Sequence, residues 1–131
     1  MTILFIDDDP DDFAFFSEGV TAAFAVSINC VYASNGKEAI QLLEKLEEPP
    51  SYIFLDYHMP IMNGKECLEI IARNPKWKDI PVYLISTTIN AERLGLLTNG
   101  AKGYLKKPKS FEELVSLLKS VAADSQGLKR A

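Results

Sequence analysis

The sequence is poor in the residues that build zinc centres, disulfide frameworks and membrane spans. It has two cysteines, Cys30 and Cys67, and a single histidine, His58, so it offers no Cys/His cluster for zinc. Both cysteines lie in apolar segments, which favours reduced, buried thiols over a disulfide. No apolar run approaches the ~20 residues that a membrane-spanning helix needs. The first residues lack the basic start of a signal peptide. We therefore expect a cytoplasmic protein without membrane contact.

Positive charge is also scarce. The chain has 14 Lys and Arg residues against 18 Asp and Glu residues, which gives a formal net charge of −4. Its only basic cluster is short: Lys102, Lys106, Lys107 and Lys109. This balance lacks the electrostatic footprint of a nucleic-acid binder. A length of 131 residues suits one domain, which we expect over 1–123, with a short tail at 124–131.

Short apolar runs alternate along the chain with segments of helical periodicity. Phe13, Phe16 and Val20, for example, fall on one face of a helix. A segment around 91–98 has a weaker helical pattern, because Gly95 lies inside it. The apolar runs that we expect to form strands are 3–6, 28–32, 52–55, 81–85 and 102–105. Five such β–α units predict an α/β fold, a doubly wound five-stranded parallel sheet with five helices.

Helix starts have recognisable capping sequences. Asp9 precedes a proline, which places a good N-cap residue before a proline at the first helical position. The tetrapeptide Asn-Gly-Lys-Glu occurs twice, at 35–38 and 63–66, and Ser110 is followed three residues later by Glu113. Each of these pairs has the spacing of a capping box. The repeat indicates shared helix-start chemistry, because the flanking residues of the two copies do not match.

Residues whose side chains can bind a metal ion or a phosphoryl group lie at the ends of four of the five predicted strands. Asp7 and Asp8 follow the first strand and Asp56 the third, while Ser86 ends the fourth and Lys107 closely follows the fifth. The carboxyl ends of parallel strands meet at one sheet edge, where ligands of such folds bind. Clustered carboxylates need protons or a cation, and an all-oxygen site beside a lysine suits Mg²⁺ and a phosphoryl group. The set therefore favours phosphoryl transfer to a carboxylate.

The sequence resembles the receiver domains of two-component response regulators over nearly its whole length. Four segments at family-like spacing carry the resemblance: Ile3–Pro10, Phe54–Gly64, Pro81–Ser86 and Gly100–Pro108. They match, in order, the opening strand with its acidic pair, the phosphoacceptor strand and its loop, the strand that ends on the switch hydroxyl, and the lysine before proline. The implied fold is flavodoxin-like, of the receiver type.

The resemblance implies a role for each matching residue of the metal and phosphate pocket. It makes Asp56 the phosphoacceptor. Asp7 and Asp8 become the acids of an Mg²⁺ pocket, with Asp8 the direct ligand, and the backbone carbonyl of His58 becomes a further ligand. Lys107 becomes the phosphate-binding lysine, in a peptide bond to proline that is often cis in this family.

The resemblance also implies a switch. Ser86 corresponds to the hydroxyl that is drawn toward the phosphoryl group, and Tyr104 to the aromatic side chain that then changes rotamer. His58 and Thr88 stand where family members tune the lifetime of the acyl phosphate. We interpret the acids Asp9, Asp11 and Asp12 as favouring the positive end of a helix dipole. Lys106 is expected in solvent, and Trp77 is expected to pack under its loop.

The implied function is a phospho-accepting signalling switch of the stand-alone type, with a sensor histidine kinase or a histidine phosphotransfer protein as donor. A kinase would dock through the first helix, and phosphorylation would change the surface of the fourth helix, fifth strand and fifth helix for an unknown downstream protein or an onward phosphorelay. We expect a monomer or weak homodimer, and no enzymatic activity beyond autophosphorylation and autodephosphorylation. Three alternatives stay open: an aspartyl-phosphate hydrolase, a flavin-binding module and a phosphorylation-independent scaffold. His58 stands where the hydrolase class has a second acid, and the acidic loop after the first strand would repel a flavin phosphate.

Overall fold

The computed structural model describes residues 1–57, 59, 62–87 and 100–123. Strands and helices alternate along this part of the chain. In chain order they are β1 (Thr2–Ile6), α1 (Pro10–Ala23), β2 (Asn29–Ala33), α2 (Gly36–Lys45), β3 (Tyr52–Asp56), α3 (Gly64–Arg73), β4 (Val82–Ser86), β5 (Gly103–Lys106) and α5 (Phe111–Ala123). The helix predicted around 91–98 and the tail predicted at 124–131 lie outside the described residues.

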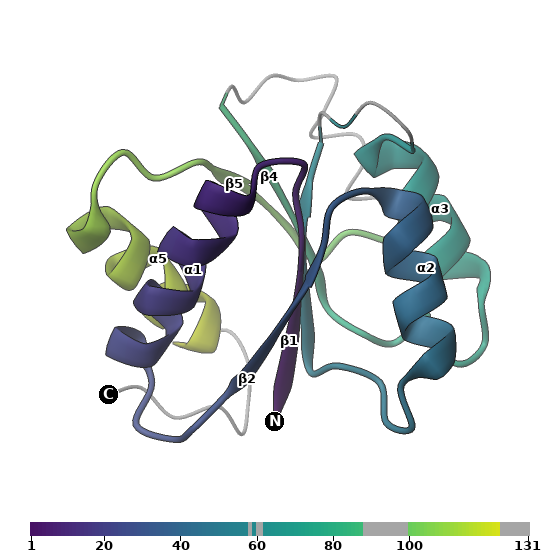
Figure 1. Cartoon of the computed structure of the whole chain (residues 1–131), viewed down its shortest axis with the longest axis horizontal. Helices are drawn as coiled ribbons and strands as arrows, with labels where there is room; N and C mark the ends of the chain where they lie inside the picture. Colours follow the sequence, from purple (N-terminus) through teal and green to yellow (C-terminus); the bar gives the residue numbers. More distant parts are fainter. Residues whose placement is uncertain (58, 60–61, 88–99, 124–131) are drawn as a thin grey trace.

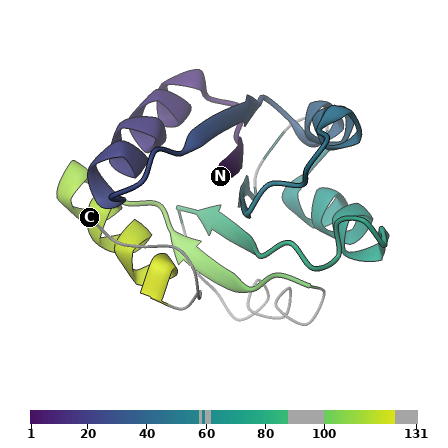
Figure 2. The ribbon, with the colours of Figure 1, turned by 90° about the horizontal axis from the view of Figure 1, so that it is seen from below.

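The five strands form one parallel sheet in the order β2-β1-β3-β4-β5. Helices α1 and α5 cover one face, and α2 and α3 cover the other (Figures 1 and 2). This arrangement confirms the predicted doubly wound α/β fold. Because β1 lies between β2 and β3 although β2 follows it in sequence, the strand order reverses at β1 and β3. The carboxyl ends of these two strands are therefore where this fold class binds ligands.

Each strand contributes side chains alternately to two hydrophobic cores. On β1, Phe5 packs toward α1 and α5, whereas Leu4 and Ile6 pack toward α2 and α3. The face under α1 and α5 is aromatic, with ring centroids 4.3 Å apart between Phe5 and Phe16 and 4.9 Å apart between Phe16 and Phe54. Burial on both faces explains why the strands read as continuous apolar runs instead of alternating with polar residues.

The helix starts are as the capping sequences predict. A side-chain oxygen of the capping residue accepts a hydrogen bond from a backbone N–H of the first turn, at Asp9, Asn35, Asn63 and Ser110. In two of them the following glutamate reaches back past the cap. Glu38 accepts from the backbone N–H of Ser34 at 3.2 Å, and Glu113 accepts from that of Lys109 at 2.8 Å. The bonds to the cap side chains satisfy donors that every helix start leaves without a partner inside the helix, and the two glutamate bonds hold the residue just before the cap.

Three further expectations are tested by the described residues. Cys30 and Cys67 are free thiols, as predicted; Cys67 is buried, also as predicted, whereas Cys30 is only half-buried. Trp77 is buried in the core under α2 and α3, also as predicted. Among the described helices, none combines the length and the apolar character that a bilayer crossing requires.

Candidate functional site

Three carboxylates from separate segments meet at the carboxyl edge of the sheet. Asp7 directly follows β1 and Asp56 ends β3, and their ligand oxygens and that of Asp8 all lie within 4.8 Å of one another. Asp7 and Asp56 are buried, with 1% and 5% of their surface exposed, whereas Asp8 is exposed. The backbone N–H of Asp7 donates to the carbonyl of Ala33 at 3.1 Å, which continues the β1–β2 pairing to this residue. The parallel sheet thus assembles the predicted acids.

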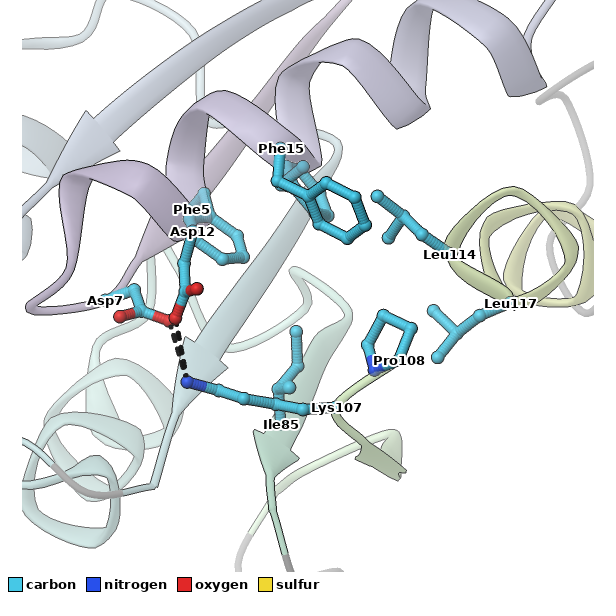
Figure 3. Close-up of a pocket in the computed structure, with 10 residues that line it drawn as sticks. Phe5, Asp7, Asp12, Phe15, Ile85, Lys107, Pro108, Leu114 and Leu117 are labelled. Atoms are coloured by element: carbon cyan, nitrogen blue, oxygen red, sulfur yellow. Dashed lines mark hydrogen bonds and ion pairs between the residues drawn. The ribbon is translucent and has the colours of Figure 1, made fainter. Parts of the chain in front are cut away.

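Lys107 places its ammonium group among these carboxylates. Its backbone N–H donates to the carbonyl of Ser86 at 2.8 Å, which fixes the chain just beyond β5. Its Nζ lies 3.2 Å from Asp7 Oδ2 and 3.7 Å from Asp56 Oδ2. A third carboxylate, that of Asp12, is 3.1 Å away and accepts a hydrogen bond from it (Figure 3). One cation is therefore shared by three acids.

The expected cis bond before Pro108 is not present, because the Lys107–Pro108 peptide bond is trans. With this trans bond, the ammonium group of Lys107 still reaches the acids, 3.2 Å from Asp7 Oδ2.

The pairing of Asp12 with Lys107 also corrects an interpretation. We expected Asp12 only to favour the dipole of α1, but its Oδ2 belongs to the acidic pocket. The sequence did contain a usable signal. Asp12 lies four residues before Phe16, so the two side chains share one face of the helix, and Phe16 is buried against the sheet. An acid on the inward face of the first turn points to the carboxyl edge of the strands.

Burial and like charge raise the pKa of Asp7. Loss of solvent is the largest cause of the shift, and the negative charges of Asp56 and Asp12 raise the pKa further. The hydrogen bond from the N–H of Asp9 and the positive charge of Lys107 lower it. The net result is a pKa of Asp7 raised from 3.8 to about 7. For Lys107, burial lowers the pKa, but the hydrogen bond to Asp12 and the charges of Asp56 and Asp7 outweigh burial and raise it. The pocket therefore holds one firmly charged lysine and an excess of carboxylates.

This pocket fits a hard divalent cation. Asp7 Oδ2 is buried and has no hydrogen-bond donor within the described residues; the ammonium of Lys107 is its ion-pair partner. Carboxylate oxygens are the ligands that Mg²⁺ and similar ions prefer. A cation among Asp7, Asp8 and Asp56 would neutralise the charge that raises the pKa of Asp7.

Of the remaining predicted site residues, Ser86 and Tyr104 lie within the described part of the chain. Ser86 is fully buried at the end of β4, one residue past Ile85, which pairs with Asp56. Tyr104 is half-buried in β5 and packs against the core under α2 and α3. His58 and Thr88 lie outside the described residues. A pocket with apolar walls opens beside the acids between α1 and α5, and it is lined by Phe5, Asp7, Asp12, Phe15, Phe16, Ile85, Lys107, Pro108, Leu114 and Leu117 (Figure 3).

Comparison with known proteins decides the family. The model of the response regulator receiver domain matches residues 3–119. The chain belongs to the response regulator receiver domain family. Among solved structures, this receiver domain is similar to the phosphorylated cyanobacterial phytochrome response regulator RcpA, with a TM-score of 0.82 and 26% identity over 92% of this chain and 89% of that one. The acidic pocket and Lys107 are consistent with a phospho-accepting switch.

Two of the curated relatives are longer proteins. The receiver domain is 36% identical to a probable cyclic di-GMP phosphodiesterase of Vibrio cholerae, over 91% of this chain and 25% of the relative. It is 34% identical to the nitrate/nitrite response regulator protein NarL of Escherichia coli, over 99% of this chain and 58% of NarL. The chain thus spans between a quarter and three-fifths of these two relatives.

Proposed function

We propose that this receiver domain accepts a phosphoryl group on Asp56, from a phosphohistidine of a sensor histidine kinase or a histidine phosphotransfer protein. The observation that carries the proposal is the position of Asp56. It ends β3 with 5% of its surface exposed, shares a cluster of ligand oxygens with Asp7 and Asp8, and lies 3.7 Å from Lys107 Nζ. A carboxylate nucleophile beside a cation site and a lysine is the arrangement that phosphoryl transfer requires.

In the proposed reaction, a carboxylate oxygen of Asp56 forms a bond to phosphorus while the bond from phosphorus to the imidazole nitrogen breaks, and the nitrogen keeps the electron pair. The ammonium of Lys107 stabilises the negative charge on the transferred group. Asp7, Asp8, Asp56 and the backbone carbonyl of His58 would hold Mg²⁺, which when bound supplies further positive charge for the phosphoryl oxygens. The product is an acyl phosphate on Asp56.

The acyl phosphate then acts as a switch. Ser86 donates a hydrogen bond to a phosphoryl oxygen, and Tyr104 fills the space that the serine hydroxyl leaves. These movements change the surface of β5, α5 and the helix predicted around 91–98. A coupling of about 1–3 kcal/mol is enough to alter partner affinity several-fold or more. His58 and Thr88 would tune how long the phosphoryl group persists.

The wider assignment is a signalling domain, not an enzyme with a separate substrate. The similar response regulator RcpA was solved in its phosphorylated form, which supports the phosphoacceptor role. We propose a domain over 1–123 with a tail at 124–131, a cytoplasmic location, and a monomer or weak homodimer. Its output would be an unknown downstream protein or an onward phosphorelay, without direct contact to nucleic acid or membrane.

Incubation with acetyl phosphate and Mg²⁺, followed by intact-protein mass spectrometry, tests the proposal. The wild-type protein should gain one phosphoryl group, whereas Asp56→Asn and an EDTA-treated sample should gain none. Rapid release of inorganic phosphate over many turnovers would favour the hydrolase alternative. A wild-type protein that is never labelled would favour the scaffold, and normal labelling of Asp56→Asn would contradict the assignment of the acceptor.

A further inference from the structure

The hydroxyl of Tyr32 is hydrogen-bonded to the main chain of Asp7, a residue of the acidic pocket. Tyr32 lies in β2, the edge strand beside β1, and is paired there with Phe5. Its hydroxyl donates a hydrogen bond of 2.7 Å to the backbone carbonyl oxygen of Asp7. Its ring stacks on Phe13 of α1, with the centroids 4.8 Å apart. The side chain therefore joins β2, the first turns of α1 and the residue from which the acidic loop starts.

This bond holds a segment that the sheet itself no longer holds. The last backbone bond of the β1–β2 pairing is the one from the N–H of Asp7 to the carbonyl of Ala33. Beyond it the chain turns into α1, and the carbonyl of Asp7 is held by the tyrosine hydroxyl. That carbonyl and the N–H of Asp8 belong to one rigid peptide plane. The hydroxyl of Tyr32 thus fixes the orientation of the backbone that leads into Asp8.

The two carboxylates depend on this backbone to different degrees. Asp7 Oδ1 also accepts a hydrogen bond from the N–H of Asp9 at 2.9 Å, so its side chain has a second restraint. The side chain of Asp8 is exposed, and no hydrogen bond or ion pair holds it within the described residues. Its place in the cluster of ligand oxygens is set by the main chain on which it stands.

We propose that Tyr32 is a positioning residue of the metal pocket, which orients the Asp7–Asp8 peptide so that both carboxylates face one divalent cation. The inference rests on the proposed function, since it assigns a task within the same Mg²⁺ site. Tyr32 itself does not touch the cation. It acts by keeping the pocket in its binding geometry before the ion arrives, which lowers the cost of binding.

The test is the Mg²⁺ affinity of the unphosphorylated protein, measured by calorimetric titration without any phosphodonor. Tyr32→Phe keeps the ring and its stacking on Phe13 but removes the hydroxyl. One neutral hydrogen bond corresponds to a loss of about two- to tenfold in affinity. Tyr52→Phe is the matched control, because Tyr52 is a buried tyrosine of the same core at the opposite, amino end of β3. It should bind Mg²⁺ as the wild type does.

Each result has a distinct meaning. A weaker affinity for Tyr32→Phe alone, with a melting temperature in EDTA within a few degrees of the wild type, supports the positioning role. Equal affinity in Tyr32→Phe and wild type overturns it and leaves the proposed function standing. An equal loss in Tyr52→Phe also overturns it, because the effect would then be a general loosening of the core. Failure of the wild type to bind Mg²⁺ overturns both this inference and the proposed pocket.

Discussion

Asp7→Asn should make the metal-free protein more stable, although it removes a residue of the functional site. Asp7 is 1% exposed, and burial together with the neighbouring acids raises its pKa from 3.8 to about 7. Its ionised form is therefore unfavourable in the folded state. Asparagine has nearly the same shape, keeps an oxygen that can accept the hydrogen bond from the N–H of Asp9, and carries no charge.

The stability gain of Asp7→Asn over the wild type should increase with pH. The folded state binds the Asp7 proton more tightly than the unfolded state does, so the contribution of Asp7 to stability is greatest at low pH and is lost as pH rises to about 7. With about 1.4 kcal/mol for each pKa unit, the variant should exceed the wild type by about 2 kcal/mol at pH 5 and about 4 kcal/mol at pH 8. The gap should shrink when Mg²⁺ binds the wild type.

Urea unfolding in EDTA, at a series of pH values from 5 to 8, measures this difference. Asp11→Asn is a suitable control, because Asp11 is an exposed acid in the first turn of α1. Its loss should cost about 0.3–1 kcal/mol through the helix dipole, with no growing gain toward pH 8. A stability gap between Asp7→Asn and wild type that does not change with pH, or a variant less stable than the wild type at pH 8, would refute the reasoning.

Three further outcomes are expected. Gly64→Ala should lower the free energy of unfolding by more than about 2 kcal/mol, because the new Cβ would lie 2.8 Å from the backbone oxygen of Asp56 at the end of β3; a loss below about 1 kcal/mol in urea unfolding would contradict this. Asp12→Asn should cost less than about 1 kcal/mol in the same assay, since its ion pair with Lys107 is partly solvated; a loss above 2 kcal/mol would argue against that geometry. Cys67 should resist thiol reagents at pH 8 in the folded protein, because burial raises its pKa to about 12; labelling as fast as in urea would show that the thiol is accessible.

Much of the fold was predictable because it depends on local patterns and on chain connectivity. Apolar runs of strand length alternate with helical periodicity, and parallel strands joined by helices must bring their carboxyl ends to one edge. The acids at the ends of β1 and β3 and the lysine after β5 could therefore be placed together from the sequence. The helix starts were readable for the same reason, since each cap involves residues at most four positions apart.

The sequence could not predict contacts that depend on how separate helices and strands pack together. Asp12 and Lys107 are 95 positions apart, and their ion pair forms because the fold brings the first turn of α1 next to the residue that follows β5. The hydroxyl of Tyr32 reaches Asp7 only because β2 pairs with β1 in this register.

The sequence by itself determined the order of strands and helices and the identity of the acids and the lysine at the sheet edge, because periodicity, capping and strand ends are local properties of the chain. Only the tertiary structure decided that Asp7 is buried enough for its pKa to reach about 7 and that Lys107 is shared by three carboxylates. These features arise from burial and from distances of a few ångströms between distant segments, which packing sets and no local pattern encodes.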